Sequence, residues 1–386
     1  KVNYIINELN KHGFEAYAVG GCVRDMVLGR TPQDWDITTS ATPYEVKKIF
    51  RRTVDTGIEH GTVTVLIDRE HYEVTTYRID GEYEDGRHPK EVSFTSSLEE
   101  DLKRRDFTIN AMAMNRFGEL IDPFGGLLDL TRRVVRFNGR PEDRIKEDAI
   151  RCIRLFRFAA TLRGFVIDDL AWKATLENLP LFQEVPYERI GKEIYKALGG
   201  NFYSFMEALE VAGYLPLILP EIYALKGVPQ DPGFHPEGDV YEHTKLCVKN
   251  AEALTSVSEI KAAAMFHDIG KPLALKEDDG RIRFMGHEKL GGSLSIEIMK
   301  RWAWPSPFVK AVSSLVRWHM IPLISLAPRR IPKLYLEYGK RWLDGLFLLS
   351  YIDITSSNGD YSSWTKNREI ALSCMFKFSG KEKLIS

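Results

Sequence analysis

The amino-acid sequence predicts an α+β protein whose strands lie in its N-terminal part and whose remainder is helical. Short runs that are apolar or rich in Val and Thr, at 17–19, 61–67 and 72–77, are typical of strands. Apolar residues at helical spacing, as in 1–13 and 149–156, indicate amphipathic helices. The strand signals therefore precede most of the helical ones.

The composition is typical of a globular protein with several domains. The 386 residues are 44% hydrophobic and 28% charged, with a formal net charge of −1, and they leave room for about two to four domains. No run of about 18 apolar residues predicts a membrane span, and no basic-then-apolar leader follows Lys1. We expect a cytoplasmic protein, with no membrane partner and with reduced thiols, since its cysteines match no metal spacing. These are Cys22, Cys152, Cys247 and Cys374.

The stretch 17–39 carries the first functional pattern. An apolar run meets Gly20 and Gly21, followed by a segment that can be helical, a turn, and a strand with Asp34 and Asp36. Adjacent glycines let backbone N–H groups approach an anion, and the N-terminus of the next helix adds the positive end of its dipole. Residues i and i+2 of a strand share a face, so we expect both carboxylates to point the same way. Two hard oxygen ligands beside a phosphate cradle suit Mg²⁺ carrying a nucleoside triphosphate.

Two later features bear on the same chemistry. Glu73 lies on the expected strand 72–77, and a neighbouring strand could bring it beside the aspartates as a third carboxylate; a pairing with Arg78 explains it equally well. The polar residues 80–91, with two glycines and a proline, predict a mobile loop.

Charged residues in 98–114 directly precede an apolar run, which is unusual for a solvated face. Arginines such as Arg105 can clamp triphosphate oxygens with paired hydrogen bonds, and Asp106 or Asn110 can bond ribose hydroxyls. Further along, Asp129 is expected to cap a helix that follows a turn.

The segment 131–163 holds ten Lys and Arg residues against four acids, enough for a phosphate-contacting patch. Its helical spacing predicts that Asp148 and Arg151 are neighbours on one helix face. Such a pair is usually an intrahelical ion pair. Alternatively it reads a base, because cytosine and adenine both present an amino donor beside a ring-nitrogen acceptor, whereas guanine and uracil present the opposite polarity.

The second half of the chain contains histidines and aspartates in a metal-binding pattern. An adjacent His-Asp pair follows an apolar helix and can share a metal with one histidine and one aspartate of other helices. Two further histidines could complete a second site, so we expect divalent transition metal there. The candidate ligands are His243, His267, Asp268, His287, His319 and Asp353.

In this order, the motifs resemble those of class II tRNA nucleotidyltransferases, the bacterial CCA-adding enzyme and poly(A) polymerase family of the polymerase-beta superfamily. The resemblance rests on the stretch 17–39, on Arg-Arg-Asp-Phe-Thr-Ile-Asn-Ala-Met-Ala at 104–113, on 121–130, on Glu-Asp-x-x-Arg at 147–151 and on 186–198. The histidine pattern resembles HD-family phosphohydrolases, which accompany this core in some bacterial members.

The resemblance implies a small mixed-sheet, polymerase-beta-like nucleotidyltransferase head followed by all-α neck, body and HD domains. The expected ranges are 1–137 for the head, 138–200 for the neck, 201–235 for the body or linker, 236–360 for the HD domain and 361–386 for a short tail.

The implied activity is template-independent addition of C and A to the 3′ end of tRNA from CTP and ATP, with no DNA partner. Asp34 and Asp36 are expected to hold two Mg²⁺, one lowering the pKa of the primer 3′-hydroxyl and the other steadying the triphosphate, so that the 3′-oxygen attacks the α-phosphorus and pyrophosphate leaves. The candidate catalytic residues are Asp34, Asp36 and Glu73. The candidate nucleotide-binding residues are Gly20, Gly21, Arg24, Asp25, Arg105, Asp106, Asn110, Asp148, Arg151 and Arg154.

Three alternatives stay open: an enzyme that adds only the terminal A, a poly(A) polymerase, and an HD phosphohydrolase whose other half binds RNA or nucleotide. In the family, a flexible loop at the place of 80–91 is needed to accept ATP after two cytidines, which favours A addition. The segment 57–62 lacks the basic Gly-Arg-Arg-Phe-type element expected of a poly(A) polymerase. Matched carboxylates and base readers argue against a half that has lost catalysis.

Overall fold

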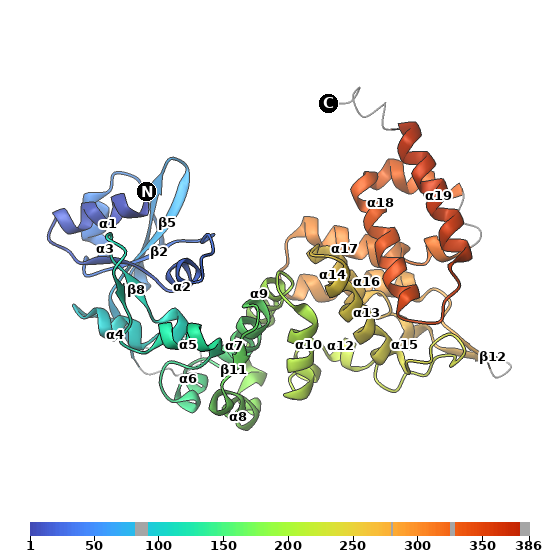
Figure 1. Ribbon diagram of the computed structural model, residues 1–386, viewed down its shortest axis with the longest axis horizontal. Helices are drawn as coiled ribbons and strands as arrows, with labels where there is room; N and C mark the ends of the chain where they lie inside the picture. Colours follow the sequence, from blue (N-terminus) through green and yellow to red (C-terminus); the bar gives the residue numbers. More distant parts are fainter. Residues whose placement is uncertain (82–91, 279–280, 325–328, 379–386) are drawn as a thin grey trace. The chain divides into compact units, whose positions relative to one another are not determined.

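The computed structural model describes residues 1–81, 92–278, 281–324 and 329–378. The chain forms two compact units, residues 1–184 (unit 1) and 185–386 (unit 2), which run in Figure 1 from blue to green and from green to red. The boundary falls inside the range expected for the neck, 138–200. The loop expected at 80–91 lies almost entirely outside the described residues.

Unit 1 contains a seven-stranded mixed sheet in the order β3-β4-β5-β2-β1-β8-β9. Strands β2 and β5 pair in parallel, and the other neighbours pair antiparallel. The expected α+β class with a mixed-sheet head is therefore confirmed. The strands are β1 (Ala16–Val19), β2 (Asp36–Thr39), β3 (Thr53–Gly57), β4 (Thr62–Ile67), β5 (Glu70–Thr76), β8 (Ala113–Met114) and β9 (Leu120–Ile121).

The helices of the sheet region form where local chemistry favours them. The first, α1 (Val2–Lys11), packs on α3 (Pro43–Ile49) and on the sheet, as Figure 1 shows. Thr42 and Glu45 form a reciprocal capping box at the start of α3, which satisfies two backbone N–H groups. Helix α2 (Gly21–Val27) follows β1 directly, as the glycine pair predicts.

The strand expected to carry both aspartates is shorter than predicted. β2 begins at Asp36, and Asp34 lies in a bend two residues earlier. The pairing of β1 with β2 also ends at Asp36, opposite Val19, because the chain of β1 turns there into α2. Asp34 therefore lies outside the strand that carries Asp36.

The rest of unit 1 is mostly helical. The expectation of an all-helical neck is wrong in one detail, because β11 pairs in parallel with β10. The remaining elements are β6 (Arg78–Asp80), β7 (Val92–Phe94), α4 (Leu98–Lys103), η2 (Thr108–Asn110), α5 (Gly126–Arg132), β10 (Val134–Val135), α6 (Pro141–Glu147), α7 (Ile150–Thr161), β11 (Val166–Ile167), α8 (Asp169–Glu177) and η3 (Leu179–Glu184), with η1 (Ile58–His60) between β3 and β4.

Asp129 does not cap a helix as predicted. It lies inside α5, where its buried carboxylate pairs with Arg136 at 2.9 Å and accepts a 2.5 Å hydrogen bond from the Thr108 hydroxyl. The cap is Asp122, whose carboxylate accepts from the backbone N–H groups of Gly126 and Leu127. The turn places Asp122 before the first free N–H groups, and Asp129 follows them.

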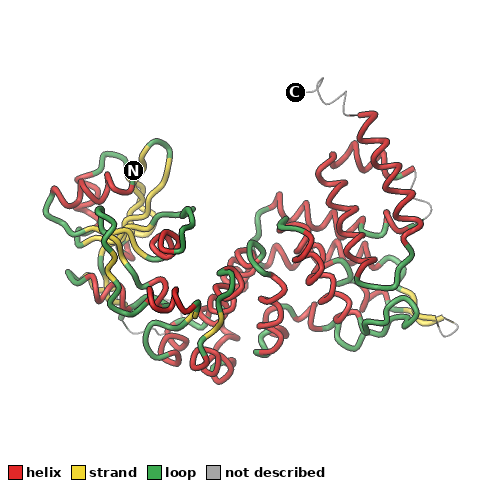
Figure 2. Tube along the Cα trace, viewed as in Figure 1, coloured by secondary structure: helices red, strands yellow, loops and turns green. Residues whose placement is uncertain are grey.

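In its described residues, unit 2 is built of helices apart from a short hairpin drawn in yellow in Figure 2. That hairpin, β12 (Lys276–Asp278) with β13 (Arg281–Arg283), departs from the expected all-α HD domain. Helix α18 is kinked at Gly339, whose φ is 81°. The helices are α9 (Tyr187–Ala197), α10 (Phe202–Val211), α11 (Leu215–Ile218), α12 (Pro220–Tyr223), α13 (Val240–Leu254), α14 (Ser258–Phe266), α15 (Lys271–Ala274), α16 (His287–Arg301), α17 (Ser306–Trp318), η4 (Ile321–Leu323), α18 (Ile331–Thr355) and α19 (Tyr361–Phe378).

None of the helices in the described ranges is both long and apolar enough to cross a membrane. The four cysteines are buried and form no disulfide.

Gly191 of α9 allows this helix to pack directly on the end of α16. A Cβ at position 191 would lie 2.3 Å from Trp302 Cβ and 2.6 Å from its carbonyl oxygen. Trp302 is buried and cannot withdraw without opening the core.

We expect Gly191→Ala to lower the free energy of unfolding of unit 2 by about 1–3 kcal/mol, because the methyl group overpacks this contact. Gly345→Ala on α18 is the matched control, since its Cβ would meet no atom closer than 3.7 Å; it should be neutral or stabilise the helix by up to about 1 kcal/mol. Urea denaturation of both variants measures the difference. Equal free energies of unfolding for the two variants would contradict the expected clash between a side chain at position 191 and Trp302.

Candidate active site and metal centre

Three carboxylates cluster at one end of the parallel strand pair in unit 1. The β2–β5 register sets Asp36 directly beside Glu73. Burial raises the pKa of Glu73, and the nearby charges of Asp36 and Asp34 raise it further. The third carboxylate that the sequence left undecided thus lies with the two aspartates.

A pocket of about 180 Å³ joins these carboxylates to three arginines. Asp36 and Glu73 line it, and so do Arg78, Arg104 and Arg105. Clustered carboxylates attract a divalent cation, and guanidinium groups bind phosphate oxygens. Both halves of a metal–triphosphate complex therefore find complementary groups in one pocket.

Asp101, to which the sequence assigned no function, holds two of these arginines. Its side chain is fully buried and lies 2.8 Å from Arg104 Nη2 and 3.5 Å from Arg105 Nη2. It also accepts from the Thr38 hydroxyl at 2.9 Å and from the Arg78 N–H at 3.4 Å. Burial raises the pKa of Asp101, but the charges of Arg105 and Arg104 outweigh it and keep the pKa below its usual value. The spacing of Asp101 three and four residues before the arginines was the signal available in the sequence.

Gly20 lies close to both Arg105 and Asp36. Its φ is +79°, and a Cβ there would lie 2.9 Å from Arg105 Nη1 and 4.0 Å from Asp36 Oδ2. Any larger residue would be strained and would press on Arg105. Arg105 Nε is buried and has no hydrogen-bond partner within the described ranges, so it can accommodate a ligand acceptor.

A second group of the expected nucleotide-binding residues forms one hydrogen-bonded chain. The Arg24 guanidinium donates to Asp25 at 2.8 Å and to Asn110 Oδ1 at 2.8 Å. The Asn110 amide donates to Asp106 at 3.1 Å, and Arg154 donates to the same carboxylate at 2.7 Å. Burial raises the pKa of Asp106, but the Arg154 charge and the Asn110 amide together lower it to about 2.

Phe158 of α7 supports this chain and was missed from the sequence. The guanidinium carbons of Arg24, Arg154 and Arg157 lie 5.1, 5.6 and 3.8 Å from its ring centroid. Cation–π contacts with one ring hold three positive side chains in place. Phe158 is one of two phenylalanines in α7, and nothing in the sequence distinguished it from Phe156.

Asp148 and Arg151 do not share a helix face as predicted. Asp148 is extended, with φ −157°, between α6 and α7, and its carboxylate accepts from the Ile150 N–H. Arg151 pairs with Glu147 instead and donates to the Arg144 carbonyl at 2.9 Å. The helix is broken at residue 148, so the i, i+3 spacing does not bring the two side chains together.

In unit 2, all six expected metal ligands converge. His243 Nε2 lies 3.3 Å from His267 Nε2 and 3.0 Å from Asp353 Oδ1. His287 Nε2 lies 3.2 Å from His319 Nε2. Asp268 lies between the two groups, with Oδ2 3.2 Å from His267 Nε2 and Oδ1 3.4 Å from His287 Nε2. The helices thus bring together residues up to 110 positions apart.

The histidines are oriented as metal ligands are. The Nδ1 atoms of His267, His287 and His319 each contact the backbone carbonyl three residues earlier, at 2.7–2.8 Å. Donation to a carbonyl fixes the proton on Nδ1 and leaves the Nε2 lone pair facing the centre. Burial lowers the pKa of His319 to about 3, and the neighbouring His287 lowers it as well, so the ring is neutral.

Three residues near this centre were not expected. Glu237 accepts from His243 Nδ1 at 2.6 Å and from His235 Nδ1 at 2.8 Å. Cys247 Sγ lies 3.5 Å from His243 Nε2. Cys247 follows His243 by one helical turn, which was the sequence signal for it.

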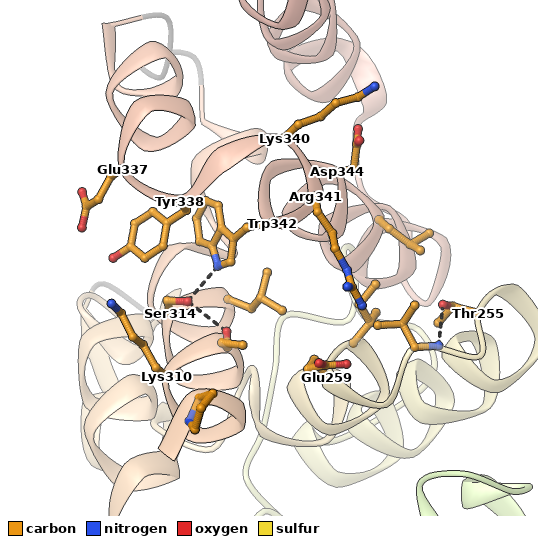
Figure 3. Close-up of a pocket in the computed structure, with 17 residues that line it drawn as sticks. Thr255, Glu259, Lys310, Ser314, Glu337, Tyr338, Lys340, Arg341, Trp342 and Asp344 are labelled. Atoms are coloured by element: carbon orange, nitrogen blue, oxygen red, sulfur yellow. Dashed lines mark hydrogen bonds between the residues drawn. The ribbon is translucent and has the colours of Figure 1, made fainter. Parts of the chain in front are cut away.

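A separate pocket of about 860 Å³ lies between α14, α17 and α18 (Figure 3). The rings of Tyr338 and Trp342 stack there with centroids 4.2 Å apart, and the Trp342 indole donates to Ser314 Oγ at 2.7 Å. None of the site residues expected from the sequence lines it.

The chain is similar in sequence to known protein families and proteins. The model of the Poly A polymerase head domain matches residues 16–136, and that of the HD domain matches 240–355. A CCA-adding enzyme of Geobacillus stearothermophilus is 50% identical over 198 residues, which are 51% of this chain and 49% of that protein. One of Enterococcus faecalis is 52% identical over 196 residues, 51% of this chain and 48% of that protein. The chain thus spans about half the length of these curated relatives.

The likeness extends further in three dimensions. The crystal structure of the Bacillus stearothermophilus CCA-adding enzyme in complex with CTP superposes with a TM-score of 0.68 and 31% sequence identity, covering 96% of this chain and 81% of that one. The match includes both units, whereas the sequence identity of the curated relatives covers about half of the chain. On this evidence, the chain belongs to the family of the CCA-adding enzymes and carries an HD domain.

Proposed function

We propose that the protein adds C and A to the 3′ end of tRNA without a template, using CTP and ATP and releasing pyrophosphate. The observation that carries the proposal is the pocket in which Asp36 and Glu73 face Arg78, Arg104 and Arg105. The similarity to a CCA-adding enzyme crystallised with CTP supports the same reaction.

The family implies dependence on a divalent metal, and we propose Mg²⁺ in two sites held by Asp34 and Asp36. The residues fit such ions, because the raised pKa of Glu73 reflects burial and carboxylate repulsion that a bound cation relieves. When bound, the ions lower the pKa of the primer 3′-hydroxyl and neutralise the triphosphate.

The remaining residues act by positioning the substrates. Arg104 and Arg105, fixed by Asp101, bind triphosphate oxygens, and the backbone at Gly20 and Gly21 approaches the phosphates. The hydrogen-bonded side chains of Arg24, Asn110 and Asp106 hold the ribose, and Arg154, which is bonded to Asp106, contacts the base. These groups set the α-phosphorus in line with the attacking 3′-oxygen.

Base selection is proposed to depend on Asp148 and Arg151. Asp148 lies between α6 and α7, and we propose that its carboxylate exchanges the hydrogen bond from the Ile150 N–H for one from an exocyclic amine of C or A. Arg151 must exchange its Glu147 contact for the ring nitrogen.

The alternatives are separated by one assay. Transfer RNAs that end before the CCA sequence, after its first C and after its second C are incubated with each labelled nucleotide. Addition of C and A in order supports the proposal, addition of A only to the third substrate indicates an A-adding enzyme, and long A tails indicate a poly(A) polymerase. No incorporation would favour the phosphohydrolase alternative.

Asp36→Ala should reduce nucleotide incorporation about 10³-fold or more, since a lost metal ligand removes several kcal/mol of transition-state stabilisation. Asp55→Ala is the control, because Asp55 lies on β3, pairs with Lys47 of α3 and does not line the pocket. Circular dichroism should show both variants folded. Retained incorporation by Asp36→Ala contradicts the assignment.

Asp148→Ala should lower the preference for CTP over UTP by roughly tenfold to a hundredfold, the worth of a hydrogen bond to a charged group. Competition between the two labelled nucleotides on a tRNA lacking its terminal CCA measures the ratio. Asp143→Ala, on the exposed side of α6, serves as the control. An unchanged ratio would exclude Asp148 as a base reader.

A second activity, metal-dependent phosphoester hydrolysis in unit 2, is favoured by the six converging ligands and their oriented histidines. Hydrolysis of chromogenic phosphomonoesters and phosphodiesters is measured with Zn²⁺, Mn²⁺ or Co²⁺. We expect His267→Ala to abolish it and to leave nucleotide addition unchanged. Absence of hydrolysis by the unmodified protein with all three metals would rule the activity out for these substrates.

The proposed location is the cytoplasm. Its reducing conditions agree with four cysteines that form no disulfide.

A further inference from the structure

The geometry of unit 2 points to Cys247 as a direct metal ligand, so that one metal is held by His243, His267, Asp353 and a thiolate. This inference rests on the proposed metal centre of unit 2 and refines it. It is independent of nucleotide addition. It changes the expected ligand set from nitrogen and oxygen alone to one that includes sulfur.

Helix α13 sets the thiol beside the first histidine. His243 and Cys247 are one turn apart and both are buried, with relative exposures of 0% and 1%. Cys247 Sγ lies 3.5 Å from His243 Nε2 and 4.0 Å from His267 Nε2. The thiol therefore faces the same two nitrogen atoms that face each other.

Two of the distances among the four candidate atoms match the edges of a tetrahedral site. Zinc bonds of about 2.3 Å to sulfur and about 2.0–2.1 Å to nitrogen imply edges of about 3.6 Å between S and N and about 3.3 Å between two N atoms. The structure has 3.5 Å between Cys247 and His243 and 3.3 Å between His243 and His267. The edges to Asp353 Oδ1 are 3.0 Å from His243 and 4.0 Å from His267.

The histidines turn the same ring atom towards this group. His243 Nδ1 contacts Glu237 and His267 Nδ1 contacts a backbone carbonyl, so the Nε2 atom of each ring is left to face the centre. The Asp353 carboxylate lies beside them. A cation bound between these atoms contacts all of them at once.

Asp268 is the obvious competitor for the fourth position, and its contacts weaken that role. Its Oδ2 lies 3.2 Å from His267 Nε2, but it also lies 2.7 Å from Lys271 Nζ and is 3.7 Å from His243 Nε2. Its Oδ1 is directed to His287 in the second group. Asp268 thus serves as a bridge between the two groups, and Cys247 is left to complete the first.

A thiolate changes which metals the centre prefers. On binding, the thiol proton is released to solvent and the sulfur donates a lone pair to the metal, with no oxidation or reduction. Soft sulfur favours Zn²⁺ or Co²⁺ over Mg²⁺, which prefers oxygen ligands.

The test is a Co²⁺ titration of the full chain after removal of metal by a chelator, under exclusion of oxygen. We expect a near-ultraviolet thiolate-to-cobalt charge-transfer band that saturates with the metal. Cys247→Ser should lose this band and should weaken Zn²⁺ binding by at least about tenfold. Cys374→Ser, which removes another buried free thiol of unit 2, should keep both.

Each other outcome overturns the inference and is distinguishable. Visible ligand-field bands without the thiolate band leave the metal centre intact and exclude Cys247 from it. Absence of all cobalt bands excludes the centre as well. A thiolate band that persists in Cys247→Ser assigns the sulfur ligand to another cysteine.

Cys247→Asp tests the same position without a thiol. This variant should lose the thiolate band and retain part of the Zn²⁺ affinity. Thermal unfolding of the metal-free variants checks that they fold.

Discussion

The register of β2 between its two neighbours is the constraint on which the nucleotide site depends. Asp36 lies opposite Val19 on one side and Glu73 on the other. Because Val19 directly precedes Gly20, this single row across the sheet brings the glycine turn, the aspartate and the glutamate together. A shift by one residue would turn Asp36 to the opposite face and separate all three.

Buried carboxylates then hold the arginine side chains near this row of residues in place. Asp101 and Asp106 are costly to bury, and each is stabilised by arginines whose charge exceeds the cost of desolvation. The same pairs hold Arg105 and Arg154 in defined positions before any substrate binds. Pre-positioned charge is what a triphosphate needs, because reorganisation during the reaction would raise the barrier.

The proposed metal centre of unit 2 follows the same logic with different chemistry. Its candidate ligands come from several helices. The backbone decides how three of the histidine rings are oriented, because the Nδ1 atom of each contacts the carbonyl group three residues earlier. Each ring can then offer only Nε2. The centre is consequently a product of helix packing, and Cys247 joins it because α13 presents one face.

The sequence by itself determined the α+β class, the glycine turn, and which residue types carry the chemistry, because strand and helix periodicity and local motif spacing are properties of neighbouring residues. It was wrong to extend the strand to Asp34, to make Asp129 a helix cap and to put Asp148 and Arg151 on one helix face, since strand ends and helix breaks depend on what packs against them. It offered no reason to single out Phe158 or Glu237, because their contacts with Arg24 and with His243 depend on how the folded segments meet. The tertiary structure alone decided that Glu73 joins Asp36, because only the pairing of β2 with β5, formed by residues 37 positions apart, brings those two carboxylates together.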